Sequence, residues 1–120
     1  MSPLARVSDE QVGAVVLVTV DGEVDASNTR ELGARLRDSL SNQAFALVVD
    51  LSAVGYIDSA GINLLFALGS ELAQRRQELH LVVPRDAPIA RMLTITGLVT
   101  AVAMHDARDE ALRDAAAAAG

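Results

Sequence analysis

The stretch ALVVDLSAVGYIDSAGINLLF, from Ala46 to Phe66, decides the fold of this chain. Its first part, Ala46 to Leu51, is a short and nearly continuous run of apolar and β-branched side chains. Such a run is typical of a strand that is covered on both faces, as in a parallel sheet. The residues from Ser52 to Ile57 contain a glycine and a tyrosine and follow no period, so we predict a loop there.

A helix is predicted to follow this loop and to run to about Arg76. Asp58 and Ser59 are both good N-cap residues, and the segment after them is apolar with helical spacing. The Ser59 hydroxyl is therefore expected at a helix N-terminus, where backbone N–H groups and the helix dipole favour an anion. From the residues alone two interpretations stay open, because a serine in this position can be a helix cap and nothing more.

Two strands are predicted before this stretch. A short edge strand at Leu4 to Ser8 is followed by a turn at Asp9 to Gly13. Ala14 to Val20 then forms a clear strand, because β-branched residues dominate it.

A helix is predicted between these strands and the central one. Asn28 with Glu31 three positions later fits a capping box, and Ser27 is an alternative cap. Three leucines then recur on one face of the helix, at Leu32, Leu36 and Leu40.

The chain after the central stretch is predicted to continue the alternation of strands and helices. In order, we expect a strand at Leu79–Val83, a helix at about Ala87–Thr96 with Gly97 as its C′ residue, a strand at Leu98–Met104, and a helix from Ala107 to about Ala116 capped by Asp106. The alanine-rich end, residues 115–120, should fray.

Strands that alternate with helices imply an α/β fold around a mostly parallel central sheet. We therefore predict one domain over residues 1–120, with a core of about 4–114, an antiparallel N-terminal strand and about four flanking helices. A chain of 120 residues suits a single core, and 51% hydrophobic but only 2% aromatic residues make that core aliphatic.

Composition excludes several classes of function. The net charge of −6 argues against a nucleic-acid partner, which needs a basic patch, and disfavours an anionic membrane surface. Cysteine is absent, so a disulfide, a thiolate nucleophile and a cysteine-ligated metal are all excluded. The apolar run nearest the N-terminus is far too short to span a bilayer, so the cytoplasm is the expected location.

The residues around Ser59 do not fit a catalytic site. A nucleophile elbow needs glycine two residues before and two residues after the serine; Gly61 is present, but Ile57 occupies the other place. The histidines, His80 and His105, lie far from Ser59 in the sequence. We therefore expect no catalytic residue, and a small hydrolase using Ser59 is the enzyme alternative.

A nucleotide or metal site is also not expected. Ile62 and Asn63 stand where a phosphate-binding loop carries lysine and serine or threonine, and the chain contains no lysine. No calcium-loop spacing is found among the acidic residues Asp21, Glu23, Asp25 and Asp58. These acids are expected to serve turns and caps, or else to form a recognition surface at the carboxyl edge of the sheet.

The segment DLSAVGYIDSAGINLL resembles the signature of anti-sigma factor antagonists, a bacterial family of STAS-domain proteins. Two other segments resemble the family: Gly22-Glu23-Val24-Asp25, and PIARMLTITGL from Pro88 to Leu98. The resemblance covers nearly the whole chain in order. It implies a STAS-like fold whose early strand pair is antiparallel.

The resemblance also implies a function. In that family a partner kinase phosphorylates the serine of an Asp-Ser-Ser-Gly or Asp-Ser-Ala-Gly motif, which matches Asp58, Ser59, Ala60 and Gly61 here. The partner implied is an anti-sigma factor that is also a serine kinase and that supplies ATP and magnesium. Binding in the unphosphorylated state would free a sigma factor for transcription, phosphorylation of Ser59 would end binding, and a phosphatase would restore the serine.

The residues implied in partner binding are Gly22, Glu23, Asp25, Ser27, Asp58, Ser59, Gly61 and Ile62. Among them, Asp58 is expected to cap the helix and orient the hydroxyl, and Gly61 to let the kinase approach closely. Ala60 replaces the commoner second serine, which leaves a single acceptor in the motif. The alternative within the family is a STAS subunit of another assembly, such as a lipid-transport complex or a stress-signalling scaffold.

Overall fold

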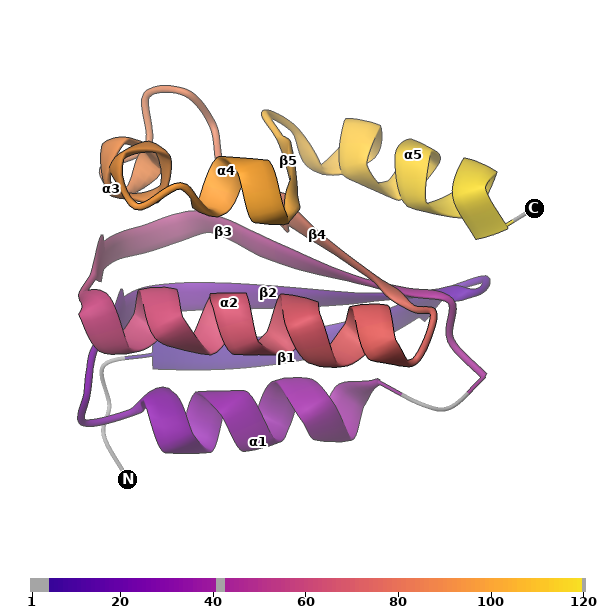
Figure 1. Ribbon diagram of the computed structural model, residues 1–120, viewed down its shortest axis with the longest axis horizontal. Coiled ribbons are helices and arrows are strands. Elements are labelled where there is room, and N and C mark those ends of the chain that lie inside the picture. The colour runs from indigo at the N-terminus through magenta and orange to yellow at the C-terminus, as the bar shows by residue number, and fades with distance from the viewer. Residues whose placement is uncertain (1–4, 41–42, 120) are drawn as a thin grey trace.

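The computed structural model describes residues 5–40 and 43–119, which form a five-stranded sheet with helices on both faces (Figure 1). In chain order the elements are β1 (Ala5–Val12), β2 (Val15–Val24), α1 (Thr29–Ser39), β3 (Ala46–Ile57), α2 (Ser59–Gln74), β4 (Glu78–Val82), α3 (Ala90–Ile95), α4 (Leu98–Ala101), β5 (Ala103–His105) and α5 (Arg108–Ala119). The predicted α/β fold is confirmed, with five helices in these residues rather than about four. Leu4 and Gly120 of the predicted ranges lie outside the described residues.

The strands lie in the order β1-β2-β3-β4-β5. β1 pairs antiparallel with β2, and the other neighbouring strands pair parallel, as predicted. Val24 at the end of β2 lies opposite Ile57 at the end of β3. The segments that follow these two strands therefore leave the sheet side by side, at its carboxyl edge.

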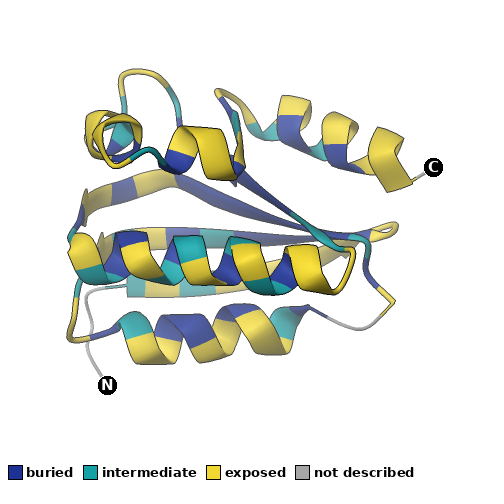
Figure 2. Cartoon of the chain, viewed as in Figure 1, coloured by how far each residue is buried: buried dark blue, intermediate teal, exposed yellow. Residues whose placement is uncertain are grey.

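The two faces of the sheet carry cores of different size. On one face, which we call the large-core face, α1 to α4 bury a continuous aliphatic core that includes Leu36, Leu68, Leu93 and Leu98. On the other, the α5 face, a single helix covers a small cluster made of Val15, Leu17, Ala46, Val48, Val82, Ala111 and Ala115. Figure 2 shows the buried strands between these layers and the exposed outer sides of α1 and α2.

β3 is longer than predicted. The expected loop from Ser52 to Ile57 is wrong, because these residues continue the strand and pair with the second half of β2. The register shifts twice along this pair, and Gly22 sits at one shift with a φ of 117°. A bulge of this kind inserts an extra residue into one strand while the two strands stay paired. The alternation of inward and outward side chains is interrupted there, so the strand cannot be recognised from the sequence.

β1 is also longer than predicted. It runs to Val12, so the expected turn at Asp9 to Gly13 is wrong, and the turn comes after Val12. Most side chains of β1 are exposed and polar, so the sequence lacks the apolar alternation that would indicate a strand. Pairing with β2 along its whole length holds it in the sheet.

The predicted strand at Leu98 to Met104 is wrong in its first half. Gly97 follows α3 with a φ of 82°, as predicted for a C′ glycine, but the chain then forms α4. Leu98 is fully buried in the large core, and this contact favours a helical turn over an extended edge strand. β5 is left with three residues.

The last helices also differ from prediction at their ends. α3 begins at Ala90 rather than near Ala87, because the preceding residues form turns in which Ala87 donates to Pro84 O and Ala90 to Ala87 O. α5 runs to Ala119, and Ala115, expected in the frayed tail, is buried against the sheet. No helix in the described part of the chain is long and apolar enough to cross a membrane.

Candidate functional site

Asp58 begins α2. Its Oδ1 accepts hydrogen bonds from the N–H groups of Ala60 at 2.9 Å and Gly61 at 3.2 Å. A carboxylate in this position satisfies two N–H groups of the first turn and lies at the positive end of the helix dipole. The predicted helix start and the predicted capping role of Asp58 are confirmed.

The same carboxylate holds the loop between β2 and α1. Asp58 Oδ2 accepts a hydrogen bond from the N–H of Ala26 at 3.1 Å, and the Asp58 N–H donates to Val24 O at 3.2 Å. These bonds join the ends of two parallel strands. The loop after β2 is thereby fixed beside the first turn of α2.

Asn28 fixes that loop from inside. It is 4% exposed; its Nδ2 donates to Glu23 O at 2.8 Å, and its Oδ1 accepts from the N–H of Asp25 at 3.0 Å. Asn28 is the N-cap residue of α1, but its side chain makes no cap bond, so the predicted capping box with Glu31 is wrong. An asparagine before a helix is read as a cap, and the sequence has no signal that distinguishes these two uses.

Ser59 is the first residue of α2 and is exposed. Within the described residues, no protein group is hydrogen-bonded to its hydroxyl. The N–H groups of Ala60 and Gly61 are already occupied by Asp58, so they are not open to a second anion. The Ser59 hydroxyl is thus accessible, while the backbone beneath it is held in place.

Gly61 and Ile62 lie under this surface and not on it. A Cβ on Gly61 would lie 2.5 Å from Ile57 Cγ1 and 2.9 Å from Val24 Cγ1. Glycine is therefore required for close packing of α2 on the ends of β2 and β3. Ile62 is buried in the large core beside it.

The other residues predicted for partner binding come together at the carboxyl edge of the sheet. Accessible or partly accessible in this place are Gly22, Glu23, Asp25, Ser27, Asp58 and Ser59. Ser27 is held through Asp25, whose Oδ1 accepts from its N–H and its hydroxyl. The carboxylates make this edge acidic, so it is complementary to a basic surface.

Tyr56 is a candidate site residue in the segment from Ser52 to Ile57 that was predicted to be a loop. It lies near the end of β3 opposite Glu23, and its side chain is half exposed. Tyrosine is enriched at protein interfaces, because its ring buries apolar area while its hydroxyl stays hydrogen-bonded. It is the one tyrosine in the sequence, and this is the sequence feature that could have drawn attention to it.

His80 and His105 do not belong to this site. Both lie on the α5 face and contact each other, with further partners at Glu78, Glu110 and Asp114. In the part of the chain that the structure describes, no three His, Asp or Glu residues are arranged to hold a metal ion. The chemistry that the site offers is therefore that of an exposed hydroxyl on an acidic surface.

The sequence and the fold both match known proteins. The chain is 29% identical over 93 residues to an anti-sigma-B factor antagonist of Listeria monocytogenes, which covers 78% of this chain and 81% of the relative. A crystal structure of an anti-sigma factor antagonist from Mycobacterium paratuberculosis superimposes with a TM-score of 0.84 at 27% identity, over 95% of this chain and 97% of that one.

The Bacillus cell fate determinant SpoIIAA in its phosphorylated form shares the fold. Its TM-score is 0.65 at 18% identity, with 91% of this chain and 98% of that one covered. Its unphosphorylated form also shares the fold, with a TM-score of 0.71 at 17% identity over 89% and 93% of the two chains. The STAS domain family itself matches residues 6–111, which is most of the sequence. The chain therefore belongs to the STAS domain family.

Proposed function

We propose that this chain is an anti-sigma factor antagonist that binds an anti-sigma factor while Ser59 is unmodified and releases it when Ser59 is phosphorylated. The observation that carries the proposal is the exposed Ser59 hydroxyl, which has no hydrogen-bond partner in the described chain and lies on a backbone held by Asp58. The names of the relatives support the class of function. SpoIIAA shares this fold in both its unphosphorylated and its phosphorylated form, which supports a fold that accommodates the modification.

The contact surface is the carboxyl edge of the sheet. Gly22, Glu23, Asp25 and Ser27 form one side of it, and Asp58 and Ser59 form the other. Gly61 and Ile62 are buried beneath this surface and contribute to binding indirectly, because their packing sets the position of the first turn of α2. The partner is expected to present basic residues around the rim of this surface.

Phosphoryl transfer to Ser59 uses groups from both proteins. The partner kinase binds ATP and magnesium, and its general base takes the proton of the Ser59 hydroxyl. The Ser59 oxygen then forms a bond to the γ-phosphorus of ATP as the bond to the β-phosphate oxygen breaks, which leaves ADP. A phosphatase reverses the modification by hydrolysis. Because ATP and the transcription machinery are in the cytoplasm, we place the protein there.

Release follows from where the new charge lies. The phosphate adds a charge of about −1.5 to −2. In the complex it faces the remaining phosphates of the nucleotide on the kinase, and within the chain it lies next to the Asp58 carboxylate. Like charges in a desolvated contact cost several kcal/mol, and about 3–4 kcal/mol weakens binding on the order of 100- to 1,000-fold.

The helix itself tolerates the charge. An anion in the first turn is stabilised by roughly 0.3–1 kcal/mol, which offsets part of the repulsion from Asp58. We therefore expect the fold to change little on phosphorylation. The switch acts through the contact and not through refolding.

The test is calorimetric titration of Ser59 variants with the anti-sigma factor that the chain captures from its host. Ser59→Ala should bind as wild type and should gain no mass from the kinase and ATP, whereas wild type should gain one phosphate. Ser59→Asp should keep the wild-type circular dichroism spectrum and lose binding. Ser70→Asp is the matched control, because Ser70 is also exposed on α2 but lies three turns further along.

Three outcomes contradict the proposal. Equal phosphorylation of Ser59→Ala would remove the acceptor assignment. Equal loss of binding in Ser70→Asp would show that charge anywhere on α2 suffices. An unfolded Ser59→Asp would show that the switch is conformational.

A further inference from the structure

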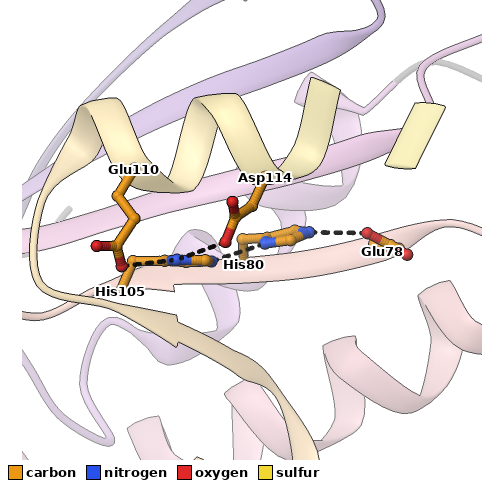
Figure 3. Close-up of polar contacts among 5 residues, drawn as sticks. All are labelled: Glu78, His80, His105, Glu110 and Asp114. Atoms are coloured by element: carbon orange, nitrogen blue, oxygen red, sulfur yellow. Dashed lines mark hydrogen bonds and ion pairs between the residues drawn. The ribbon is translucent and has the colours of Figure 1, made fainter. Parts of the chain in front are cut away.

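Five polar side chains form a line across the α5 face (Figure 3). His80 Nδ1 lies 2.9 Å from His105 Nε2, and the two ring planes are nearly parallel. At one end, His80 Nε2 lies 2.8 Å from Glu78 Oε1. At the other end, His105 Nδ1 lies 3.2 Å from Glu110 Oε1 and 3.5 Å from Asp114 Oδ2.

Hydrogen bonds at all of these contacts require a definite number of ring hydrogens. A carboxylate only accepts hydrogen bonds, so His80 Nε2 and His105 Nδ1 must each carry a hydrogen. The two nitrogens that face each other need one more hydrogen between them, donated by one ring and accepted by the other. The four ring nitrogens therefore carry three hydrogens, whereas two neutral imidazoles carry two. The pair has one positive charge.

Other proton counts do not fit this arrangement. With two hydrogens, either the central nitrogens face each other with two lone pairs or one ring presents a lone pair to a carboxylate. With four hydrogens, two N–H groups point at each other across 2.9 Å. Each alternative replaces a hydrogen bond by repulsion in a place where both rings are almost fully buried.

The surrounding groups suit a positive charge. Glu78 lies on β4, and Glu110 and Asp114 lie on α5, so carboxylates face the pair from both sides (Figure 3). Of three arginines on the neighbouring segments, Arg113 on α5 is exposed, and the other two are engaged elsewhere. Arg108 on α5 donates to Asp50 and Thr19, and Arg85 in the segment after β4 pairs with Asp106.

The pair joins β5 and α5, which bury little apolar area, to β4, which also pairs with β3 along its length. β5 has three residues, each paired with one residue of β4. α5 buries only the small side chains of Ala111 and Ala115 and partly buries Leu112. Because apolar area is limited here, the polar contacts carry a larger share of the attachment of α5 and β5.

We propose that His80 and His105 form a proton-binding site whose single shared proton holds β5 and α5 against β4. Release of this proton at high pH leaves either two lone pairs facing each other or a lone pair facing a carboxylate, so part of the line separates and the α5 face loosens. Addition of a further proton at low pH separates the pair as well. This inference does not rest on the proposed function, and the large-core face with Ser59 is expected to be unaffected.

The test combines two measurements on the full chain between about pH 5 and pH 9. Nitrogen NMR of the imidazoles follows the number of ring hydrogens, and amide hydrogen exchange follows the opening of each element. We expect three hydrogens on the pair in the middle of this range, with stepwise release above it. In the same step, exchange corrected for its intrinsic pH dependence should become about 10- to 100-fold faster in β5 and α5 and stay constant in β3 and α2.

Two variants separate the proton from attachment in general. His105→Gln replaces the titrating ring by an amide that can donate and accept at every pH, so the pH-dependent step in α5 should vanish. Leu112→Ala weakens α5 through an apolar contact that carries no charge, so α5 should open faster at all pH values and keep the step. The proposal is overturned if wild type carries two ring hydrogens throughout, or if the rings titrate while exchange in α5 stays constant.

Discussion

The two faces of the sheet hold their helices by different means. On the large-core face, α1 to α4 pack on a continuous set of buried leucines, valines and isoleucines. On the α5 face, the apolar cluster is small, and charged groups complete the attachment of the helix. Apolar burial is insensitive to pH, whereas hydrogen-bonded charges are not. The helix that presents Ser59 is thus on the face that changes in pH disturb less.

Asp50 is a buried carboxylate that depends on a partner from α5. This aspartate is 6% exposed, and Arg108 donates to it from Nε at 2.9 Å and to Thr19 Oγ1 from Nη2 at 3.0 Å. A buried carboxylate without a partner is strongly destabilising, so α5 must supply the cation that Asp50 needs. Asp50 would be an unpaired buried carboxylate without Arg108, and Arg108 would lack its acceptor without Asp50.

The largest expected effect comes from removing apolar volume on the large-core face. Leu68 is fully buried in the middle of α2, so Leu68→Ala should lower the free energy of unfolding by about 2–5 kcal/mol. Leu112→Ala on the half-buried side of α5 should cost about 1 kcal/mol. Urea unfolding of both variants measures the difference. Equal losses would mean that the two faces contribute alike, against the comparison drawn above.

A smaller effect is expected where the large core meets the site. In Gly61→Ala, the new Cβ lies within van der Waals radii of Ile57 and Val24, and overpacking of this kind costs about 1–3 kcal/mol. Because the first turn of α2 must shift, binding of the anti-sigma factor should weaken as well. Gly55→Ala is the control, since its Cβ meets nothing within 4 Å and the residue is exposed. Thermal unfolding should place Gly55→Ala at or above wild type; a loss equal to that of Gly61→Ala would rule out the packing explanation.

The smallest effect is expected from a charged pair that is exposed. Arg37 on α1 donates two hydrogen bonds to Glu71 on α2, at 2.9 and 2.8 Å, and both side chains are 41% exposed. Removing this pair by Glu71→Gln should cost only about 0.2–1 kcal/mol near neutral pH, because water screens it.

This pair also has a defined pH dependence. The hydrogen bonds from Arg37 hold the pKa of Glu71 below its ordinary value of 4.5. A lowered native pKa contributes stability above the ordinary value, and that contribution is lost as the pH falls through the native one. The difference in unfolding free energy between wild type and Glu71→Gln should therefore shrink to zero on acidification below about pH 4.5. A difference that persists in acid would assign the effect to packing of the side chain.

Much of the site could be predicted from local patterns. The apolar run from Ala46, the capping residue Asp58 and the leucine spacing of α1 depend on interactions within a few residues, so they are legible in one stretch of sequence. The family resemblance then assigned a role to Ser59. These predictions concern where elements lie and which residue begins them.

The sequence by itself determined the alternation of strands and helices, the central strand and the helix that Asp58 caps. Only the tertiary structure decided the length of β3 and β1, the turn of helix at Leu98, the use of Asn28 inside the β2–α1 loop, and the meeting of His80 with His105. Except for Asn28, whose partners Glu23 and Asp25 are local, the physical reason is the same in each case: the group that satisfies the residue comes from another part of the chain. His105 lies 25 residues from His80, and the Asp58 carboxylate binds Ala26 across 32 residues. A pattern of neighbouring residues cannot indicate a partner that lies this far away in the sequence.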